Sequence, residues 1–143
     1  EFALSCDLRI ASENAKFGFP EVSVGGTVTT AGTKLIAQLV GLGRAKEMLF
    51  TAEMVDAYRA KEWGLVNVVV SDADLENAAL EMAGKIAKNS PLSVRLTRKA
   101  VDLGLAASFE EILEIETRHA VEATAAGETQ RRMVARMEEM KKK

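Results

Sequence analysis

The sequence has little of what stabilises small secreted domains or anchors proteins in membranes. Its 143 residues include one cysteine and two prolines. Cys6 alone forms no internal disulfide, and we expect it to be a small buried residue in a reducing compartment. No apolar run approaches the roughly 18 residues that cross a bilayer, and no signal-peptide pattern opens the chain. We therefore expect a cytoplasmic protein that works without a membrane.

Aromatic residues are also scarce, and the chain has no excess of positive charge. Aromatics make up 5% of the chain, so the core must be built from Ala, Val, Leu, Ile and Met. The formal net charge is −2, which argues against the broad basic surface of a nucleic-acid-binding protein. The charge is uneven, since residues 128–143 hold six Lys or Arg against three Glu. Residues 128–143 are therefore net basic, and the residues before them are net acidic.

What is present is the composition of a globular protein, with 48% hydrophobic and 28% charged residues. Residues 7–12 alternate like a short strand, and residues 65–70 form a short apolar strand. Apolar residues elsewhere recur at helical spacing, which predicts a small α/β portion followed by a run of helices. The predicted helices cover residues 30–40, 41–51, 55–64, 72–89, 91–105, 108–126 and 128–143.

Capping residues support these helix boundaries. Thr29 or Thr30 is available as the N-cap of the first helix, and Gly41 is its expected end. Ser90 precedes a proline that suits the first turn of a helix. Residues 108–111, Ser-Phe-Glu-Glu, have the spacing of a capping box.

Residues 17–35, FGFPEVSVGGTVTTAGTKL, raise the question of a phosphate-binding loop. Such a loop needs two glycines separated by four residues, followed by Lys and then a hydroxyl residue. Here five residues separate Gly26 from Gly32, and Lys34 follows Thr33 instead of preceding it. The dinucleotide pattern G-x-G-x-x-G is missing as well. We therefore reject a nucleotide-phosphate site in this segment.

Other conspicuous residues have structural explanations. His119 lacks the further His or Cys ligands of a metal site, so we expect no metal and a solvent-facing histidine. Met133, Met137 and Met140 share one face of the last helix and are expected to fill a core or an interface. Trp63 is expected to pack rather than to recognise a ligand.

Three motifs, in the right order, resemble the enoyl-CoA hydratase/isomerase (crotonase) family. Residues 1–25, EFALSCDLRIASENAKFGFPEVSVG, are similar to the family's strand and its FGxPE segment. Residues 39–70, LVGLGRAKEMLFTAEMVDAYRAKEWGLVNVVV, resemble its RAxEMxLTG and GLVNxVV run. Residues 89–101, NSPLSVRLTRKAV, resemble the segment that follows. The resemblance covers the whole chain and corresponds to the C-terminal half of a full-length member.

This resemblance implies a fold and an assembly. Residues 1–70 would form the C-terminal part of a crotonase-like α/β core, a portion of its ββα spiral. Residues 71–143 would form a helical C-terminal region that serves oligomerisation and covers the active site. The expected partners are an acyl-CoA thioester substrate and further copies of the chain, in a homotrimer or a dimer of trimers. No nucleic acid is expected as a partner.

By the same resemblance, the two hydratase carboxylates fall on Glu1 and Glu21. Adding water to a 2-enoyl-CoA needs one group that takes a proton from water and another that delivers one to the α-carbon. No cofactor is implied, because coenzyme A is part of the substrate. The alternatives are a solvated loop carboxylate for Glu21 and a disordered terminal residue for Glu1. The resemblance further implies substrate-binding roles for Gly26, Thr29 and Lys141.

Thr29 would bind through its backbone amide, and Lys141 would contact CoA phosphates. On the residues alone, the lysine run 141–143 is typical of a solvated helix end, and contact with CoA phosphates is its functional alternative. The sequence departs from the family where Val28-Thr29-Thr30-Ala31 replaces a Pro-Gly-Ala-Gly turn and where Ala52 replaces a common glycine. The first departure leaves open an isomerase or another acyl-CoA reaction of this family.

The family stabilises its thioester enolate with two backbone N–H groups. The resemblance assigns both groups to sequence before Glu1, so we expect that this chain alone is not a competent enzyme. A non-catalytic helical oligomerisation fragment is therefore a further alternative.

Overall fold

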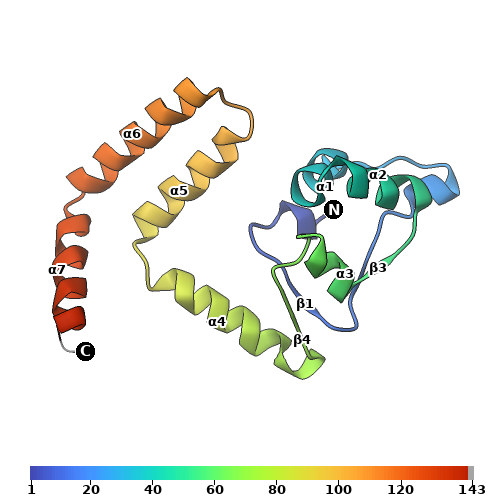
Figure 1. The fold of residues 1–143 in the computed structure, drawn as a ribbon, viewed down its shortest axis with the longest axis horizontal. Coiled ribbons are helices and arrows are strands. Elements are labelled where there is room, and N and C mark those ends of the chain that lie inside the picture. The colour runs from blue at the N-terminus through green and yellow to red at the C-terminus, as the bar shows by residue number, and fades with distance from the viewer. Residues whose placement is uncertain (142–143) are drawn as a thin grey trace. The chain divides into compact units, whose positions relative to one another are not determined.

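The computed structural model describes residues 1–141 (Figure 1). The chain divides into two compact units, Glu1–Glu81 and Met82–Lys143, and the division falls inside helix α4 (Leu75–Ala87). Each unit has its own packing. No helix among the described residues is long and apolar enough to cross a membrane.

Two short strand pairs organise the first unit. Strand β1 (Ile10–Ser12) pairs in parallel with β4 (Val68–Val70), and β2 (Lys16–Phe17) pairs antiparallel with β3 (Val55–Asp56). The two predicted strands are confirmed, although each is shorter than expected. Residues 55–56 form β3 instead of the start of the predicted helix 55–64, because two residues give no periodicity and Asp56 is the N-cap of the helix. The parallel pair joins the segment CDLRIAS to the segment GLVNVVV (Figure 1).

Arg9 ties the start of β1 to the chain before β4. Its side chain is buried, and its Nε donates to the carbonyl of Leu65 at 2.6 Å while Nη1 donates to the carbonyl of Cys6 at 2.6 Å. Hydrogen bonds from a charged donor are stronger than neutral ones, so these contacts hold the loop before β1 in place. The prediction that Cys6 is buried is wrong: the residue is exposed, and its thiol donates to the carbonyl of Phe2.

Helices α1 and α2 pack against each other and supply much of the core of the first unit. Ile36 on α1 and Met48 on α2 are fully buried, together with Val66 before β4. Trp63 is also buried and lies under the guanidinium of Arg59, 4.6 Å from its ring centroid, so its predicted packing role is confirmed. The helical elements of this unit are η1 (Ala3–Ser5), η2 (Glu21–Val24), α1 (Gly32–Val40), α2 (Leu42–Thr51), α3 (Ala57–Glu62) and η3 (Asp72–Asp74).

Helix α1 ends as predicted at Gly41 but begins differently. Its N-cap is Ala31, which has a left-handed conformation (φ 59°) and no side-chain capping hydrogen bond. The prediction that Thr29 or Thr30 caps this helix is therefore wrong. The physical reason is that Thr29 makes its hydrogen bonds to Glu1 instead.

Ala52 ends α2 with φ 55°, where a residue with a Cβ is strained. The left-handed region costs an L-residue about 1–2 kcal/mol that glycine does not incur. We expect Ala52→Gly to raise the free energy of unfolding by about 1 kcal/mol in urea denaturation. The matched control is Ala79→Gly in the middle of α4, which should lower it by about 0.5–1 kcal/mol. A destabilised Ala52→Gly variant would contradict the assigned strain.

The second unit contains three further helices, α5 (Pro91–Gly104), α6 (Phe109–Ala125) and α7 (Glu128–Lys141). Helices α5 and α6 lie side by side (Figure 1). The capping box before α6 is confirmed, since the Ser108 hydroxyl accepts from the Glu111 N–H and the Glu111 carboxylate accepts from the Ser108 N–H. The predicted N-cap of α5 is confirmed as well.

The apolar face of α7 is exposed within the described residues. Met133, Met137 and Met140 are 65%, 53% and 64% exposed, and Val134 between them is 53% exposed. The prediction that these methionines fill a core is therefore wrong for the described chain. Their role in an interface stays a prediction.

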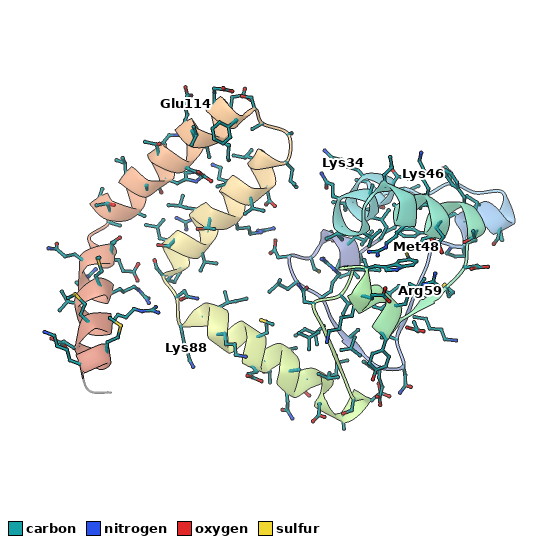
Figure 2. The ribbon with its side chains drawn as sticks, in the orientation of Figure 1. Lys34, Lys46, Met48, Arg59, Lys88 and Glu114 are labelled. Carbon is teal, nitrogen blue, oxygen red and sulfur yellow. The ribbon has the colours of Figure 1, made fainter. Side chains whose placement is uncertain are left out.

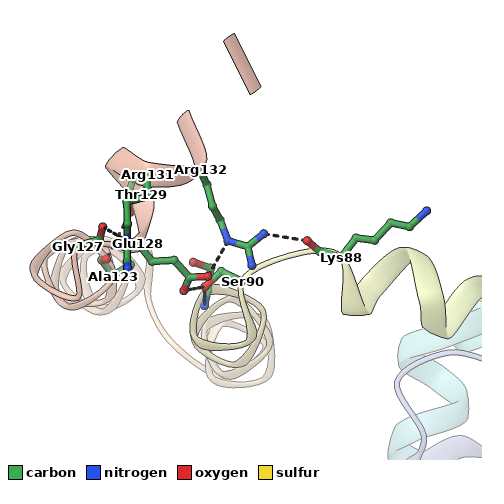
Figure 3. Close-up of polar contacts among 9 residues, drawn as sticks. Lys88, Ser90, Ala123, Gly127, Glu128, Thr129, Arg131 and Arg132 are labelled. Carbon is green, nitrogen blue, oxygen red and sulfur yellow. Dashed lines mark hydrogen bonds and ion pairs between the residues drawn. The ribbon is translucent and has the colours of Figure 1, made fainter. Parts of the chain in front are cut away.

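Glu128 holds the start of α7 to the loop before α5 (Figure 3). The Ser90 hydroxyl and the Arg132 Nε each donate to its carboxylate at 2.6 Å, and Arg132 also donates to the carbonyl of Lys88 at 2.8 Å. These hydrogen bonds, chiefly that from Ser90, lower the pKa of Glu128 below its usual 4.5. The charged carboxylate therefore stabilises the folded unit.

This contact makes the second unit sensitive to acid. Because the folded-state pKa of Glu128 is depressed, its contribution is complete above about pH 4.5 and is lost as the pH falls through the lower folded-state pKa. We expect Glu128→Gln to lower the urea midpoint at pH 7 and to match the native protein in strong acid. Glu138→Gln, which changes an exposed carboxylate on the same helix, is the control and should leave the midpoint unchanged. A difference that persists in acid would contradict this assignment.

Candidate active site

Glu21 is held in a tight turn directly after Pro20. Pro20 precedes the 3-10 helix η2, and Gly25 ends it with a left-handed conformation (φ 75°) that a glycine adopts without strain. The Gly26 N–H donates to the carbonyl of Glu21 at 2.8 Å. A Cβ on Gly26 would lie 3.2 Å from that carbonyl oxygen. The Glu21 carbonyl is therefore closely packed against Gly26.

The side chain of Glu21 has an unusual environment for a carboxylate. Its Oε2 atom is shielded from solvent and has no hydrogen-bond partner within residues 1–141. Leaving a shielded polar atom unpaired costs roughly 1–3 kcal/mol, so such atoms are rare and are often found where a ligand or a reacting group binds. Glu21 is therefore not the fully solvated loop carboxylate of the alternative explanation.

Glu1 is bound to the loop that precedes α1. The Thr29 N–H donates to Oε1 of Glu1 at 2.7 Å, and the Thr29 hydroxyl lies 3.4 Å from both carboxylate oxygens. The two residues are 28 positions apart. Glu1 is half-buried and makes specific contacts, so the structure gives no support to the alternative of a disordered terminal residue.

Gly32 leaves room for the carboxylate of Glu1. It is buried at the first position of α1, and a Cβ there would lie 3.1 Å from Oε1 of Glu1 and 2.7 Å from Cγ1 of Val28. The second distance is shorter than real Cβ contacts. The missing side chain therefore allows Glu1 and Val28 to pack against the helix.

Backbone strain is concentrated in the same loop. Thr30 and Ala31 have φ values of 50° and 59°, in the left-handed region that costs an L-residue about 1–2 kcal/mol. The cost is greatest for a β-branched residue such as Thr30. Strained backbone of this kind is typical of functional loops. Here it follows Thr29, which contacts the carboxylate of Glu1, and the Thr30 hydroxyl lies 3.4 Å from that of Thr29.

The predicted site residues therefore form two local groups. Glu1 lies with Thr29, and Glu21 lies with Gly26. No hydrogen bond joins the two carboxylates within the described part of the chain. Thr29 contacts the Glu1 carboxylate through its N–H and its hydroxyl, and the Gly26 N–H donates to the Glu21 carbonyl. The roles of Thr29 and Gly26 in substrate binding stay predictions. Lys34, which a phosphate-binding loop would need near the loop, is exposed and extends outward from α1 (Figure 2).

Comparison with known proteins decides the family. The profile described as enoyl-CoA hydratase/isomerase matches residues 1–143. The chain belongs to the enoyl-CoA hydratase/isomerase family. It is 44% identical over 117 residues to the short-chain-enoyl-CoA hydratase of Clostridium acetobutylicum, a match that covers 82% of this chain and 45% of that protein. The chain thus spans less than half the length of this relative.

Solved structures confirm the predicted crotonase-like α/β fold. An enoyl-CoA hydratase from Bacillus anthracis matches with a TM-score of 0.80 and 39% identity, over 82% of this chain and 45% of that one. A candidate enoyl-CoA hydratase from Thermobifida fusca, solved in complex with CoA, matches with a TM-score of 0.84 and 27% identity, over 88% of this chain and 49% of that one. This family member therefore has the fold of the matching part of these enoyl-CoA hydratase structures.

In this family member, the predicted CoA contact Lys141 lies in the last turn of α7 and is exposed. The rest of its lysine run, residues 142–143, lies outside the described residues. A groove of about 1350 Å³ lies between α5 and α7 nearby. Its lining combines cations with apolar residues, including Lys88, Arg132, Arg136, Met133 and Met140.

The prediction that His119 faces solvent is wrong. The residue is half-buried, and its Nδ1 is shielded from solvent without a hydrogen-bond partner among the described residues. It lines a groove of about 270 Å³ between α5 and α6. The reason is visible in the spacing: His119 follows Ile112 and Ile115 on the inner face of α6. The position of His119 on this stripe predicts a half-buried side chain.

Proposed function

We propose that the protein containing this chain adds water to the double bond of a 2-enoyl-CoA thioester. The observation that carries this proposal is the shielded, unpaired Oε2 of Glu21, in a family whose relatives include a short-chain-enoyl-CoA hydratase. A carboxylate oxygen without a structural partner is available for proton exchange with a bound substrate. We further propose that the chain corresponds to the C-terminal half of a family member.

In the proposed reaction, Glu1 and Glu21 share the acid and base duties. One carboxylate takes a proton from water while the water oxygen bonds to the β-carbon, and the π electrons move into a thioester enolate. The other carboxyl group then delivers its proton to the α-carbon. After one turnover the pair has exchanged one proton, and transfer between the two groups or with solvent restores the starting state. The fixed position of Glu1 on the Thr29 N–H supports this arrangement.

The proposed substrate is an acyl-CoA thioester of short chain length, in line with the printed activity of the Clostridium relative. The Thermobifida structure, which holds CoA, supports a CoA-bound substrate. Gly26 and Thr29 are proposed to line the substrate site, and Lys141 to contact the CoA phosphates. Proton transfer between carboxylates and water needs no cofactor beyond the CoA of the substrate. We propose a cytoplasmic location.

The proposal is tested by assaying the full-length protein with 2-enoyl-CoA and 3-enoyl-CoA thioesters of two to three chain lengths. Hydration of the 2-enoyl substrates, followed by loss of their conjugated absorbance, is the expected result. Conversion of 3-enoyl-CoA to 2-enoyl-CoA without hydration would instead support the isomerase alternative, which the altered loop Val28–Ala31 keeps open. Turnover of neither substrate would contradict both.

A second candidate is a helical oligomerisation module without activity of its own. The exposed apolar face of α7, formed by Met133, Val134, Met137 and Met140, favours self-association because such faces usually bind another surface. The same face supports a homotrimer or dimer of trimers for the enzyme. Light scattering coupled to size exclusion tests both ideas, and a strictly monomeric protein would remove their support.

A further inference from the structure

The Thr29 hydroxyl occupies a defined place beside Glu1. Its Oγ1 lies 3.4 Å from Oε1 and 3.4 Å from Oε2 of the carboxylate, whereas the Thr29 N–H lies 2.7 Å from Oε1 only. Oε1 of Glu1 therefore accepts a hydrogen bond from the backbone. Among residues 1–141, the Thr29 hydroxyl is the hydrogen-bond partner of Oε2.

The hydroxyl and the N–H differ in what they can do when Glu1 changes its protonation state. A backbone N–H is a donor only, so it serves the ionised carboxylate. A hydroxyl has one donor hydrogen and two acceptor lone pairs, so it can donate to the carboxylate or accept from the protonated acid by rotating about one bond. Thr29 can thus remain bound to Glu1 in both states without moving a heavy atom.

The backbone of the loop supports this role. Thr30 and Ala31 adopt left-handed conformations that L-residues rarely adopt, and the Thr30 hydroxyl lies 3.4 Å from that of Thr29. Thr30 can therefore donate to Thr29 while Thr29 donates to Glu1. This short chain of hydroxyls favours the observed orientation of the Thr29 side chain.

We propose that the Thr29 side-chain hydroxyl is a positioning residue for Glu1, which leaves Oε2 as the oxygen that exchanges a proton with the reacting water. The inference rests on the proposed hydration activity and goes beyond the backbone role expected for Thr29. Hydrogen bonds at catalytic sites are often long before substrate binds and tighten in the complex, so the 3.4 Å contacts are expected to shorten with substrate bound.

The test compares Thr29→Val, which keeps the shape and removes the hydroxyl, with Thr29→Ser, which keeps the hydroxyl. We expect Val to lower kcat about tenfold, the effect of one lost hydrogen bond, with KM within about twofold. Ser should restore kcat to within about threefold of the native value. The pH profile of kcat should change for Val and not for Ser. Thr27→Val, an exposed threonine in the same loop, is the matched control with native turnover.

Two outcomes would overturn the positioning role while the hydration activity stands. One is native kcat and an unchanged pH profile in Thr29→Val; the other is equal loss in the Val and Ser variants, which would indicate packing instead of the hydroxyl. Glu1→Gln, assayed beside them, separates this failure from failure of the proposed function. If Glu1→Gln retains native turnover, the catalytic role assigned to Glu1 is wrong, and positioning its carboxylate does not contribute to catalysis.

Discussion

Replacing Glu21 with glutamine is expected to reduce kcat for 2-enoyl-CoA hydration by about 10²–10⁴-fold, the usual contribution of a positioned acid or base. Glutamine has nearly the shape of glutamate but neither accepts nor delivers a proton at neutral pH. KM should change little, because the substitution removes proton transfer and leaves the surrounding turn of Pro20 and Gly26 intact. Steady-state kinetics of the purified full-length variant measures both constants.

The environment of Glu21 also predicts the stability of the Glu21→Gln variant. Oε2 has no hydrogen-bond partner in residues 1–141, so the amide breaks no existing contact at that atom. Because glutamine has nearly the shape of glutamate, the substitution should leave the free energy of unfolding nearly unchanged. Loss of activity with retained stability separates a catalytic role from a structural one. Glu62→Gln, an exposed carboxylate on α3, should keep native activity and stability.

If Glu21→Gln hydrates its substrate at the native rate, the assigned chemistry is wrong, whatever the family of the chain. If both Glu21→Gln and Glu62→Gln lose activity and unfold at lower urea concentration, the effect is one of stability. The comparison therefore tests the role of Glu21 more sharply than a single variant.

Local sequence signals predicted the elements well and the tertiary contacts poorly. The capping box at Ser108 and the proline after Ser90 placed α5 and α6 because each signal acts within a few residues. The start of α1 was mispredicted because Thr29 bonds to Glu1, a residue 28 positions away. The exposure of Cys6 depends in the same way on packing that short segments do not encode.

The candidate site shows the same division. The family resemblance pointed to Glu1, Glu21 and Thr29, and their roles stay predictions. The resemblance could not show that Oε2 of Glu21 is shielded without a partner, or that the Thr29 hydroxyl lies beside both oxygens of Glu1. The loop that carries Thr29 also has a left-handed backbone at Thr30, a conformation that β-branched residues rarely adopt. No sequence pattern predicted it.

Gly32 offers the second large effect, because its missing side chain makes room for Glu1. We expect Gly32→Ala to lower kcat about 100-fold, since a displacement of about 1 Å at a catalytic group can cost that much. The new Cβ would lie 3.1 Å from Oε1 of Glu1 and 2.7 Å from Cγ1 of Val28, so both side chains must move. Gly43→Ala on α2, where no atom lies within 4 Å of the added Cβ, is the control.

The double variant Val28→Ala with Gly32→Ala distinguishes the two contacts that the new methyl group makes. Removing Cγ1 of Val28 relieves the shorter contact and leaves the one with Oε1 of Glu1. The contact with Val28 should also lower the free energy of unfolding of Gly32→Ala, and the double variant should regain it. If displacement of Glu1 causes the loss of activity, kcat of the double variant should nevertheless stay about 100-fold low. Recovery of kcat together with stability would instead show that crowding at Val28 was responsible. Urea denaturation and steady-state kinetics of the single and double variants give both readouts, and Gly43→Ala should show native kcat with a slightly more stable helix.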